Sequence, residues 1–441
     1  MKKWLAVLVI FVVILAVSVA CHKKSGGDEA VIAPTNPNEP VIPPSGPGPA
    51  PGTPVIVFSN PTQAAQATAS FAGTQALASA QFAVAKALGV DAQPAGFAPS
   101  LSKSGDIGKI DPAVAEMMKN MTEFANSAAI QRTVKKVGVL RAKAMRAAVP
   151  STTLTTDACN FDGQAVISGE NTYDDPTNPN IISKYDINFT NCKDDADMAQ
   201  LDGKLHIETV MSTDNDGVAV TLVADGLKKV KFAAADFAAT TLTSVMTGTF
   251  ISEDNVTTAT NFATGSFVVT TPATATAVEN VATFEYIGLE ENKTFTHNTD
   301  GSDEHVTTTK GTFKITSTTG GTQSLQMSLA LDLTDNARNL NDAAGTINSK
   351  LNGSVDMIFA SNPATAACLS GKLNISTVDT SPRVFTTAGG TCPVNGTVKI
   401  NTATVNYEPA GTPIQVAVDN GTPVSFADCA ALDAAGGACK F

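Results

Sequence analysis

The stretch Leu325-Gln-Met-Ser-Leu-Ala-Leu-Asp-Leu333 decides the fold. Every second residue in it is a large apolar side chain, and the residues between are Gln, Ser, Ala and Asp. Successive side chains of a β-strand point to opposite faces, so the pattern predicts a strand with one buried and one solvent-facing side. An α-helix would need an apolar repeat of about 3.6 residues, which this stretch lacks.

Shorter alternations of the same kind recur from Ser151 to the end of the chain, with Thr at many of the exposed positions. Pairs such as Asp216-Gly217 and Asn420-Gly421 separate them and are typical of tight hairpin turns. We therefore predict about 14 antiparallel strands, joined mostly by hairpins. Examples of the alternation are Ile187/Phe189, Leu205/Ile207, Phe313/Ile315, Leu373/Ile375 and Val398/Ile400.

A short unit with a central glycine repeats within this β region. Its form is an apolar residue, Asp/Asn/Ser, Gly, any residue, apolar, any residue, apolar, and each copy indicates a glycine at a turn or bulge leading into a strand. Copies begin at Phe161, Leu201, Leu351, Leu369 and Val394. The arrangement of cysteine, hairpin, Asn-Cys and Leu-Asp-Gly resembles the β-rich lipoproteins of Gram-negative envelopes. That resemblance covers about the last two-thirds of the chain and implies no catalytic residues.

The N-terminus has the plan of an export signal. Lys2 and Lys3 precede an apolar run from Trp4 to Ala20, which ends in small residues. Cys21 follows directly after Ser18-Val19-Ala20. Small residues before a cysteine resemble the lipobox of bacterial lipoproteins, in which the signal is cut before the cysteine and the cysteine is acylated. The resemblance implies a signal peptide over 1–20, lipidation at Cys21 and, because His22 rather than Asp follows, sorting to the outer membrane.

A proline-rich segment separates the expected anchor from the rest of the chain. Nine prolines lie between Ala33 and Pro54. Proline fixes φ and lacks an N–H group, so residues 21–58 are predicted to form an extended tether.

A helical module is predicted over residues 59–150. Asn60-Pro61 and Asp111-Pro112 are both typical helix starts, with a capping side chain before a proline. After the second start, Val114, Met117, Met121 and Phe124 fall at helical spacing, and the same helix is expected to run on into a basic tail. The methionine-rich face is either an adaptable binding surface or, as we expect, part of the core.

Charge is distributed unevenly along the chain. The formal net charge is −12, which argues against nucleic acid as a partner. The helical module is nevertheless basic and the β region acidic. The basic tail of the helical module could bind anionic lipid headgroups or, as we expect, complement the acidic β region within the same molecule. The tail cations are Arg132, Lys135, Lys136, Arg141, Lys143 and Arg146.

Cysteine usage also indicates export. Of seven cysteines, six remain after Cys21, an even number in a secreted context. Six cysteines allow 15 connectivities, and metal binding is the other interpretation of such residues. No Cys-x-x-Cys pair or nearby histidine supports metal binding. Proximity in the sequence favours the disulfides Cys159–Cys192, Cys368–Cys392 and Cys429–Cys439.

The search for catalytic and metal-binding motifs is largely negative. The chain has no Gly-x-Ser-x-Gly, no His-Glu-x-x-His and no phosphate-binding loop, so we predict no enzymatic activity and no cofactor. One weak metal-site candidate brackets a predicted turn, where carboxylates lie near two histidines. Its residues are His297, Asp300, Asp303, Glu304 and His305.

These observations predict a mainly β protein with an N-terminal α module. An antiparallel sheet over 151–441 with one apolar face needs a cover, and the helical module needs a partner. We expect a large curved meander, an open or half barrel, with the helices on or in its concave face. A transmembrane barrel is the alternative, but the four tyrosines and the single tryptophan, Trp4, are too few for an aromatic girdle.

The expected function is that of a lipid-anchored envelope protein that faces the periplasm or the cell surface. A curved sheet with helices in its concave side resembles the folds of envelope lipid carriers, which implies a non-enzymatic protein that binds an apolar or lipid ligand. The alternative is a structural or interaction lipoprotein that presents its sheet to another envelope component. Neither interpretation involves nucleic acid.

Overall fold

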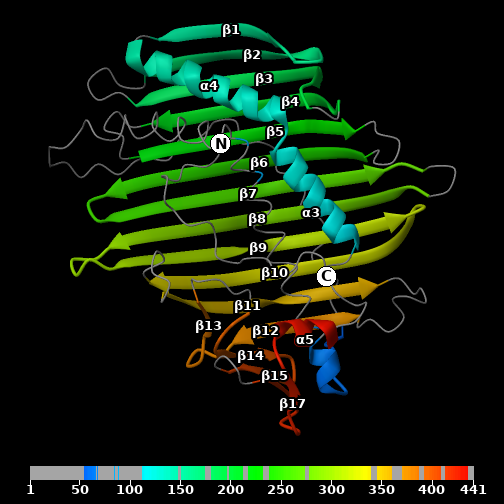
Figure 1. The fold of residues 1–441 in the computed structure, drawn as a ribbon. Coiled ribbons are helices and arrows are strands. Elements are labelled where there is room, and N and C mark those ends of the chain that lie inside the picture. The colour runs from blue at the N-terminus through cyan, green and yellow to red at the C-terminus, as the bar shows by residue number, and fades with distance from the viewer. Residues whose placement is uncertain are drawn as a thin grey trace, which may run out of the picture. The chain divides into compact units, whose positions relative to one another are not determined.

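The structure is a computed structural model, in which the chain divides into two units, Met1–Gly48 and Pro49–Phe441. The residues that it describes all belong to the second unit (Figure 1). They are 54–65, 67, 84, 88, 112–147, 150–173, 180–195, 198–211, 217–231, 238–273, 278–338, 345–359, 370–386, 392–408 and 413–435. The predicted signal peptide, Cys21 and most of the tether lie outside this set.

One antiparallel sheet of 17 strands makes up most of the described chain. Its strands are β1 (Ser151–Ala158), β2 (Asp162–Tyr173), β3 (Ile181–Lys193), β4 (Gln200–Met211), β5 (Gly217–Lys231), β6 (Ala238–Glu253), β7 (Val256–Thr271), β8 (Asn280–His297), β9 (Asp303–Thr319), β10 (Thr322–Arg338), β11 (Thr346–Phe359), β12 (Gly371–Thr377), β13 (Arg383–Thr386), β14 (Gly396–Ile400), β15 (Ala403–Tyr407), β16 (Ile414–Val418) and β17 (Val424–Phe426). The predicted β region is confirmed, with a few more strands than the expected 14.

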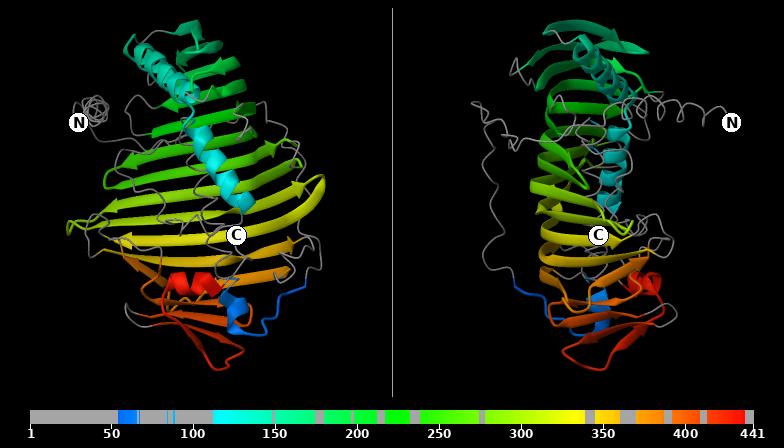
Figure 2. Two further views of the ribbon diagram at one scale, coloured as in Figure 1. Left: turned by 45° about the vertical axis from the view of Figure 1, so that its right-hand side comes forward. Right: turned by 90° about the vertical axis from the view of Figure 1, so that its left-hand side faces the viewer.

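The strands follow one another as a meander. Each strand from β1 to β11 pairs with the next, and β14 to β17 continue in the same way. Between them, β11 pairs with both β12 and β13, and β12 pairs with β14. Within the described residues β1 and β17 form the two ends of an open, curved sheet (Figures 1 and 2).

Three helices are described in full, α3 (Pro112–Ala125), α4 (Ala128–Ala147) and α5 (Cys429–Ala435). Residues 61–65 are also helical, and the Asn60 side chain accepts a hydrogen bond from the Gln63 N–H at 3.1 Å. The predicted helix start at Asn60-Pro61 is therefore found with its cap, and α3 begins at Pro112 as predicted, while Asp111 lies outside the described residues. The single long helix expected after Pro112 is instead two helices, because the chain breaks at Asn126-Ser127 and Asp195 caps the second one.

The helices α3 and α4 lie across one face of the sheet, as predicted (Figures 1 and 2). The edge of the Phe124 ring on α3 meets the Phe267 ring on β7, with ring centroids 5.6 Å apart. Met117 and Met121 are fully buried, so the methionine-rich face of α3 is core. Leu329 and Leu333, from the stretch that opened the sequence analysis, are buried on the same side of the sheet.

The folded body begins slightly earlier than the expected boundary between residues 58 and 59. Val55 forms a parallel bridge with Lys372 at the start of β12, and Ile56 and Phe58 are buried. Gly371 leaves room for this approach, since a Cβ there would lie 2.7 Å from the carbonyl oxygen of Pro54. The end of the tether is thus fixed beside β12.

None of the helices in the described part of the chain is long and apolar enough to cross a membrane.

Candidate functional site

The most unusual feature of the concave face is a row of polar side chains that crosses five strands. Paired residues of neighbouring strands lie on the same face, and the register joins Lys293 of β8 to Thr307 of β9, Thr307 to Asp335 of β10, Asp335 to Ser349 of β11, and Ser349 to Arg383 of β13. We call these five residues the polar row. Apolar residues flank it on the same face, among them Leu289, Leu333 and Leu351.

One end of the polar row holds a buried ion pair. The Lys293 Nζ lies 3.0 Å from Oε2 of Glu291, two residues earlier on the same face of β8. Only 1% of Glu291 and 6% of Lys293 is exposed. The Asn261 amide on β7 donates to the same Glu291 oxygen at 3.3 Å. These contacts compensate both charges, which would otherwise be very costly to bury.

The other end of the row is a hydrogen-bonded chain. The Arg383 Nη2 donates to Ser349 Oγ at 2.8 Å, and Ser349 in turn is hydrogen-bonded to the Asp335 carboxyl. Arg383 also lies over the Phe385 ring, at 5.5 Å from the centroid, and its Nε is buried without a hydrogen-bond partner. This end therefore keeps one donor that the described residues do not satisfy.

Burial dominates the protonation equilibria at this end. It raises the pKa of Asp335, although the Ser349 hydrogen bond and the Arg383 charge act in the opposite direction. Burial likewise lowers the pKa of Arg383, against the influence of Tyr407 and Asp335. The row is therefore a strip of buried or half-buried polar groups whose opposite charges compensate one another.

The five residues of the predicted metal site do not converge. They lie around the β8–β9 hairpin, but Glu304 points to the opposite face and accepts a hydrogen bond from Asn336 at 2.9 Å. Asp300 accepts from the N–H and hydroxyl of Ser302 within the turn.

The two histidines of that candidate have separate neighbours. His297 Nδ1 lies 2.6 Å from Asp303 Oδ1, whereas the His305 ring packs edge-on against Phe295. Burial lowers the pKa of His305, with Asp303 opposing. His305 shares its face with Thr307, so it extends the polar row toward the hairpin rather than forming a metal centre.

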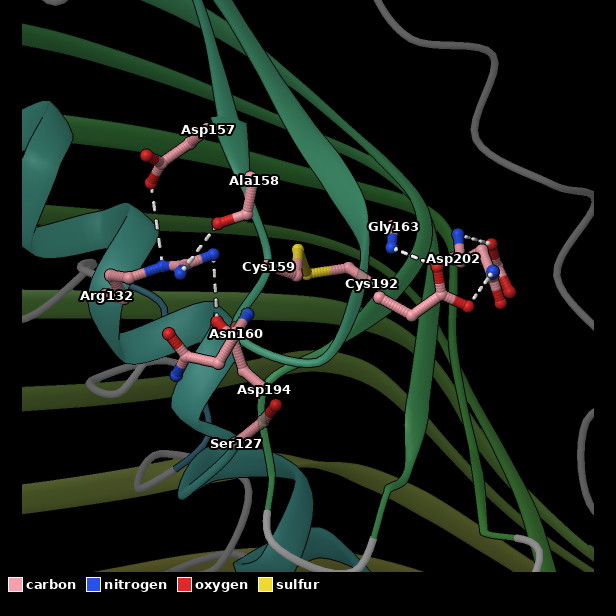
Figure 3. Close-up of a disulfide and its surroundings, with 12 residues drawn as sticks. Ser127, Arg132, Asp157, Ala158, Cys159, Asn160, Gly163, Cys192, Asp194 and Asp202 are labelled. Carbon is pink, nitrogen blue, oxygen red and sulfur yellow. Dashed lines mark hydrogen bonds and ion pairs between the residues drawn. A yellow bond between two sulfur atoms is a disulfide. The ribbon is translucent and has the colours of Figure 1, made fainter.

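Disulfides stabilise both ends of the sheet. Cys159 and Cys192 are bonded as predicted, with their Cα atoms 5.4 Å apart (Figure 3). Asp194 lies close to both sulfur atoms, and this is the one group of potential metal ligands found among the described residues. Its two thiols are consumed by the disulfide, and Asp194 pairs with Arg132 at 2.9 Å, so it is not a metal site.

The second disulfide corrects the sequence prediction. Cys392 is bonded to Cys429, so the expected pairs Cys368–Cys392 and Cys429–Cys439 are wrong. The pairing follows from the meander, which returns the chain from β17 to the region of β14 and places the start of α5 beside Cys392, 37 residues earlier. Cys368 and Cys439 themselves lie outside the described residues, as does the expected lipidation site, Cys21.

The basic tail of the helical module binds the sheet. Arg132 donates to the Ala158 carbonyl at 3.0 Å and pairs with Asp157 at 3.5 Å (Figure 3). Lys136 also pairs with Asp157, at 2.9 Å. Arg141 donates to Thr209 at 3.1 Å. Burial lowers the pKa of Arg141, with Tyr185 opposing. These three cations therefore complement the sheet, as expected, while Lys135 and Lys143 are exposed.

The polar row was not predicted from the sequence, although one signal for it is present there. Asp335 continues the buried phase of Leu329 and Leu333, and Lys293 and Glu291 likewise occupy the buried phase of β8. A charged residue at an apolar position of a long strand indicates an internal ion pair or a site.

No protein-family model, no characterised protein and no solved structure matches this chain significantly.

Proposed function

We propose that this protein is an exported, lipid-anchored envelope protein that carries an amphiphilic ligand, such as a lipid, in the concave side of its sheet. The disulfides support an oxidising, exported compartment. An anchor at Cys21 and sorting to the outer membrane are inferred from the N-terminal sequence alone. The proposed role requires no catalytic residues and no cofactor.

The observation that carries the proposal is the polar row within an otherwise apolar concave face. Replacing a buried ion pair by packed apolar residues is often neutral or stabilising, so stability alone does not account for such a row. An amphiphile would use both parts of the surface. Its head would contact the row, where Arg383 has an unsatisfied donor. Its chains would have to displace the groups that now bury the apolar strip formed by Phe284, Phe313 and Leu329.

The order of side chains along the strands also supports binding of an amphiphile in one orientation. The Phe284 and Phe313 rings stack with centroids 5.6 Å apart, and along β8 the residues of this face change from Phe284 through Leu289 to Glu291 and Lys293. The concave face therefore grades from apolar to polar along the strands. Binding sites for small ligands commonly combine an apolar lining with a few polar groups of this kind.

Native mass spectrometry of the full-length protein, extracted in a mild detergent, tests the proposal. We expect a population heavier than the anchored protein by the mass of one amphiphile. The double variant Glu291→Gln/Lys293→Met, which leaves no unpaired charge, should lose most of that population. The matched control is Lys310→Met, because Lys310 is 57% exposed on the opposite face of β9. An absence of bound amphiphile from the parent protein would refute the carrier function, and retention by the double variant would refute the role of the row.

A further inference from the structure

The first strand of the sheet has an open edge. Among the described residues, β1 pairs only with β2, from Ser151 opposite Asn171 to Ala158 opposite Gln164 (Figure 1). The pairing runs without a bulge over all eight residues of β1, which include no Lys, Arg, Pro or Gly. Natural sheets usually protect exposed edges with such features, since unpaired backbone groups can bind another strand.

The opposite end of the sheet is protected. β17 has only three residues, and α5 packs against it. The Cys392–Cys429 disulfide holds the start of this helix to the body. The fold thus blocks strand addition at β17 and leaves β1 able to accept a strand.

The side chains of β1 are suited to close pairing with a neutral strand. Its one charged residue, Asp157, is bound by Arg132 and Lys136 from α4 on the concave side. On the convex side Thr152, Leu154 and Thr156 are exposed, and 78% of Leu154 is accessible to solvent. A leucine this exposed on a β edge gains from being covered.

We propose that two copies of this chain join through β1, in antiparallel pairing about a two-fold axis perpendicular to the sheet. Such an axis places residues of the same face of the sheet opposite each other. Residues of one face of β1 have sequence numbers that are all even or all odd, so the sequence numbers of two facing residues always add to the same even number. Leu154 then faces Leu154 of the second copy on the axis, and Asp157 faces Ser151, which avoids opposed carboxylates. Thr152 then faces Thr156 and Thr153 faces Thr155, whereas Ala158 would oppose Pro150, outside β1.

The chain enters the described body far from this edge. The chain enters the folded body beside β12, where Ile56 N–H donates to the Lys372 carbonyl at 3.0 Å. At about 4.8 Å for each strand, β1 is roughly 50 Å away across the sheet. A paired assembly would join the two sheets at β1, on the side away from the bridge between Val55 and Lys372. This inference does not depend on the nature of the ligand.

Charge substitution at position 154 tests the pairing directly. For the full-length protein in detergent, we expect light scattering to show a dimer that Leu154→Lys and Leu154→Glu each weaken at least tenfold, because each variant opposes like charges on the axis. A mixture of the two variants should restore the dimer, since Lys then faces Glu. The matched control is Ile287→Lys, a substitution of a half-exposed residue on the convex face of β8, which should leave the dimer unchanged.

A photo-crosslinking amino acid at position 154 provides a second readout that does not depend on the stability of the charged variants. It should yield chain-to-chain adducts in membranes, whereas the same label at position 287 should not. A parent protein that stays monomeric at high micromolar concentration would overturn the proposal. So would crosslinks made only to a different protein, or failure of the mixed variants to recover the dimer.

Discussion

Leu329 shows how a single side chain connects the sequence pattern to the core. It is 1% exposed, and its cross-strand partners on the same face are Phe313 of β9 and Val355 of β11, both also buried. Its neighbour Ser328 points to the opposite, more exposed face. The period of two predicted from the sequence is therefore found in the burial of adjacent residues.

We expect Leu329→Ala to destabilise the protein by about 2–5 kcal/mol, because it removes buried methyl groups and leaves a cavity between three strands. Ser328→Ala should change the free energy of unfolding by less than about 0.5 kcal/mol. Denaturant unfolding of the two variants provides the comparison. Equal effects from both substitutions would contradict the strand register.

Asp335 makes the stability of the folded protein depend on pH, and the direction of its pKa shift fixes the direction of that dependence. Burial raises the pKa of Asp335 above the ordinary value for an aspartate, so the folded state holds the proton more tightly than the unfolded state. The associated stability is present below the unfolded pKa and is lost as the pH rises through the folded pKa. We expect the parent protein to lose stability relative to Asp335→Asn as the pH rises above the ordinary aspartate pKa of about 4.

The control for Asp335 is Asp332→Asn, since Asp332 lies on the opposite face of β10 with half of its side chain exposed. Thermal melts over the same pH series should show a nearly constant difference between this variant and the parent. A constant difference for Asp335→Asn as well would mean that burial does not shift this carboxyl.

At the scale of elements, Asp195 decides where the second helix begins. Its carboxylate accepts from the Ala128 N–H at 2.7 Å and from the Ser127 hydroxyl at 3.3 Å, and it pairs with Lys229 at 2.8 Å. It therefore caps α4 and also neutralises a lysine that is almost fully buried on β5. An aspartate from the loop after β3 thus separates α3 from α4.

Asp195→Ala should cost about 1–2 kcal/mol for the lost cap and more for the uncompensated Lys229. Asp195→Asn retains a capping oxygen and should lie between the parent and the alanine variant. Asp186→Ala on β3, where the side chain is 74% exposed, is the control and should have little effect. Chemical denaturation orders the four proteins, and equal stability of the Ala and Asn variants at the parent value would exclude the capping role.

Disulfides set the connections between elements at the C-terminal end. Non-reducing peptide mapping of the exported protein should recover Cys159–Cys192 and Cys392–Cys429, which leaves Cys368 and Cys439 as the third pair. Replacing Cys392 and Cys429 by Ser should destabilise the protein by about 3–4 kcal/mol on the chain-entropy model. Recovery of Cys368–Cys392 from a natively folded sample would contradict the structure.

At the scale of the whole molecule, the chain joins the folded body far from the open sheet edge. Val55 bridges to Lys372 at the start of β12, whereas β1 is the strand at one end of the sheet (Figure 1). The point at which the chain enters the body is therefore separate from the edge of β1.

Cys21→Ser tests the anchor itself. We expect the variant either to be released from the membrane fraction or to accumulate as the uncut precursor, because the cysteine is both the cleavage signal and the acylated residue in the lipoproteins that this N-terminus resembles. Membrane fractionation and gel mobility give the readout, and Cys159→Ser serves as a control that leaves the N-terminus intact. A Cys21→Ser variant that fractionates and migrates like the parent would exclude lipidation.

The sequence by itself determined the class of this fold. Alternation such as that of Leu325–Leu333, the glycine-containing turns and the two capped helix starts are local properties, and local backbone geometry follows from them. The pairing of Cys159 with Cys192 was also accessible, because a single hairpin lies between them. The net charges of the helical module and the β region, which have opposite signs, also correctly predicted that cations of α4 bind the sheet.

Only the tertiary structure decided which distant residues meet. The polar row joins residues from Lys293 to Arg383 through the register of five strands, and a shift of one residue in any pairing would send part of it to the other face. Asp195 caps the start of α4 although it lies 67 positions after Ala128 in the chain. Cys392 lies next to Cys429 because strands β14 to β17 bring the chain back to the same region. These contacts depend on long-range pairing, which local sequence patterns do not specify.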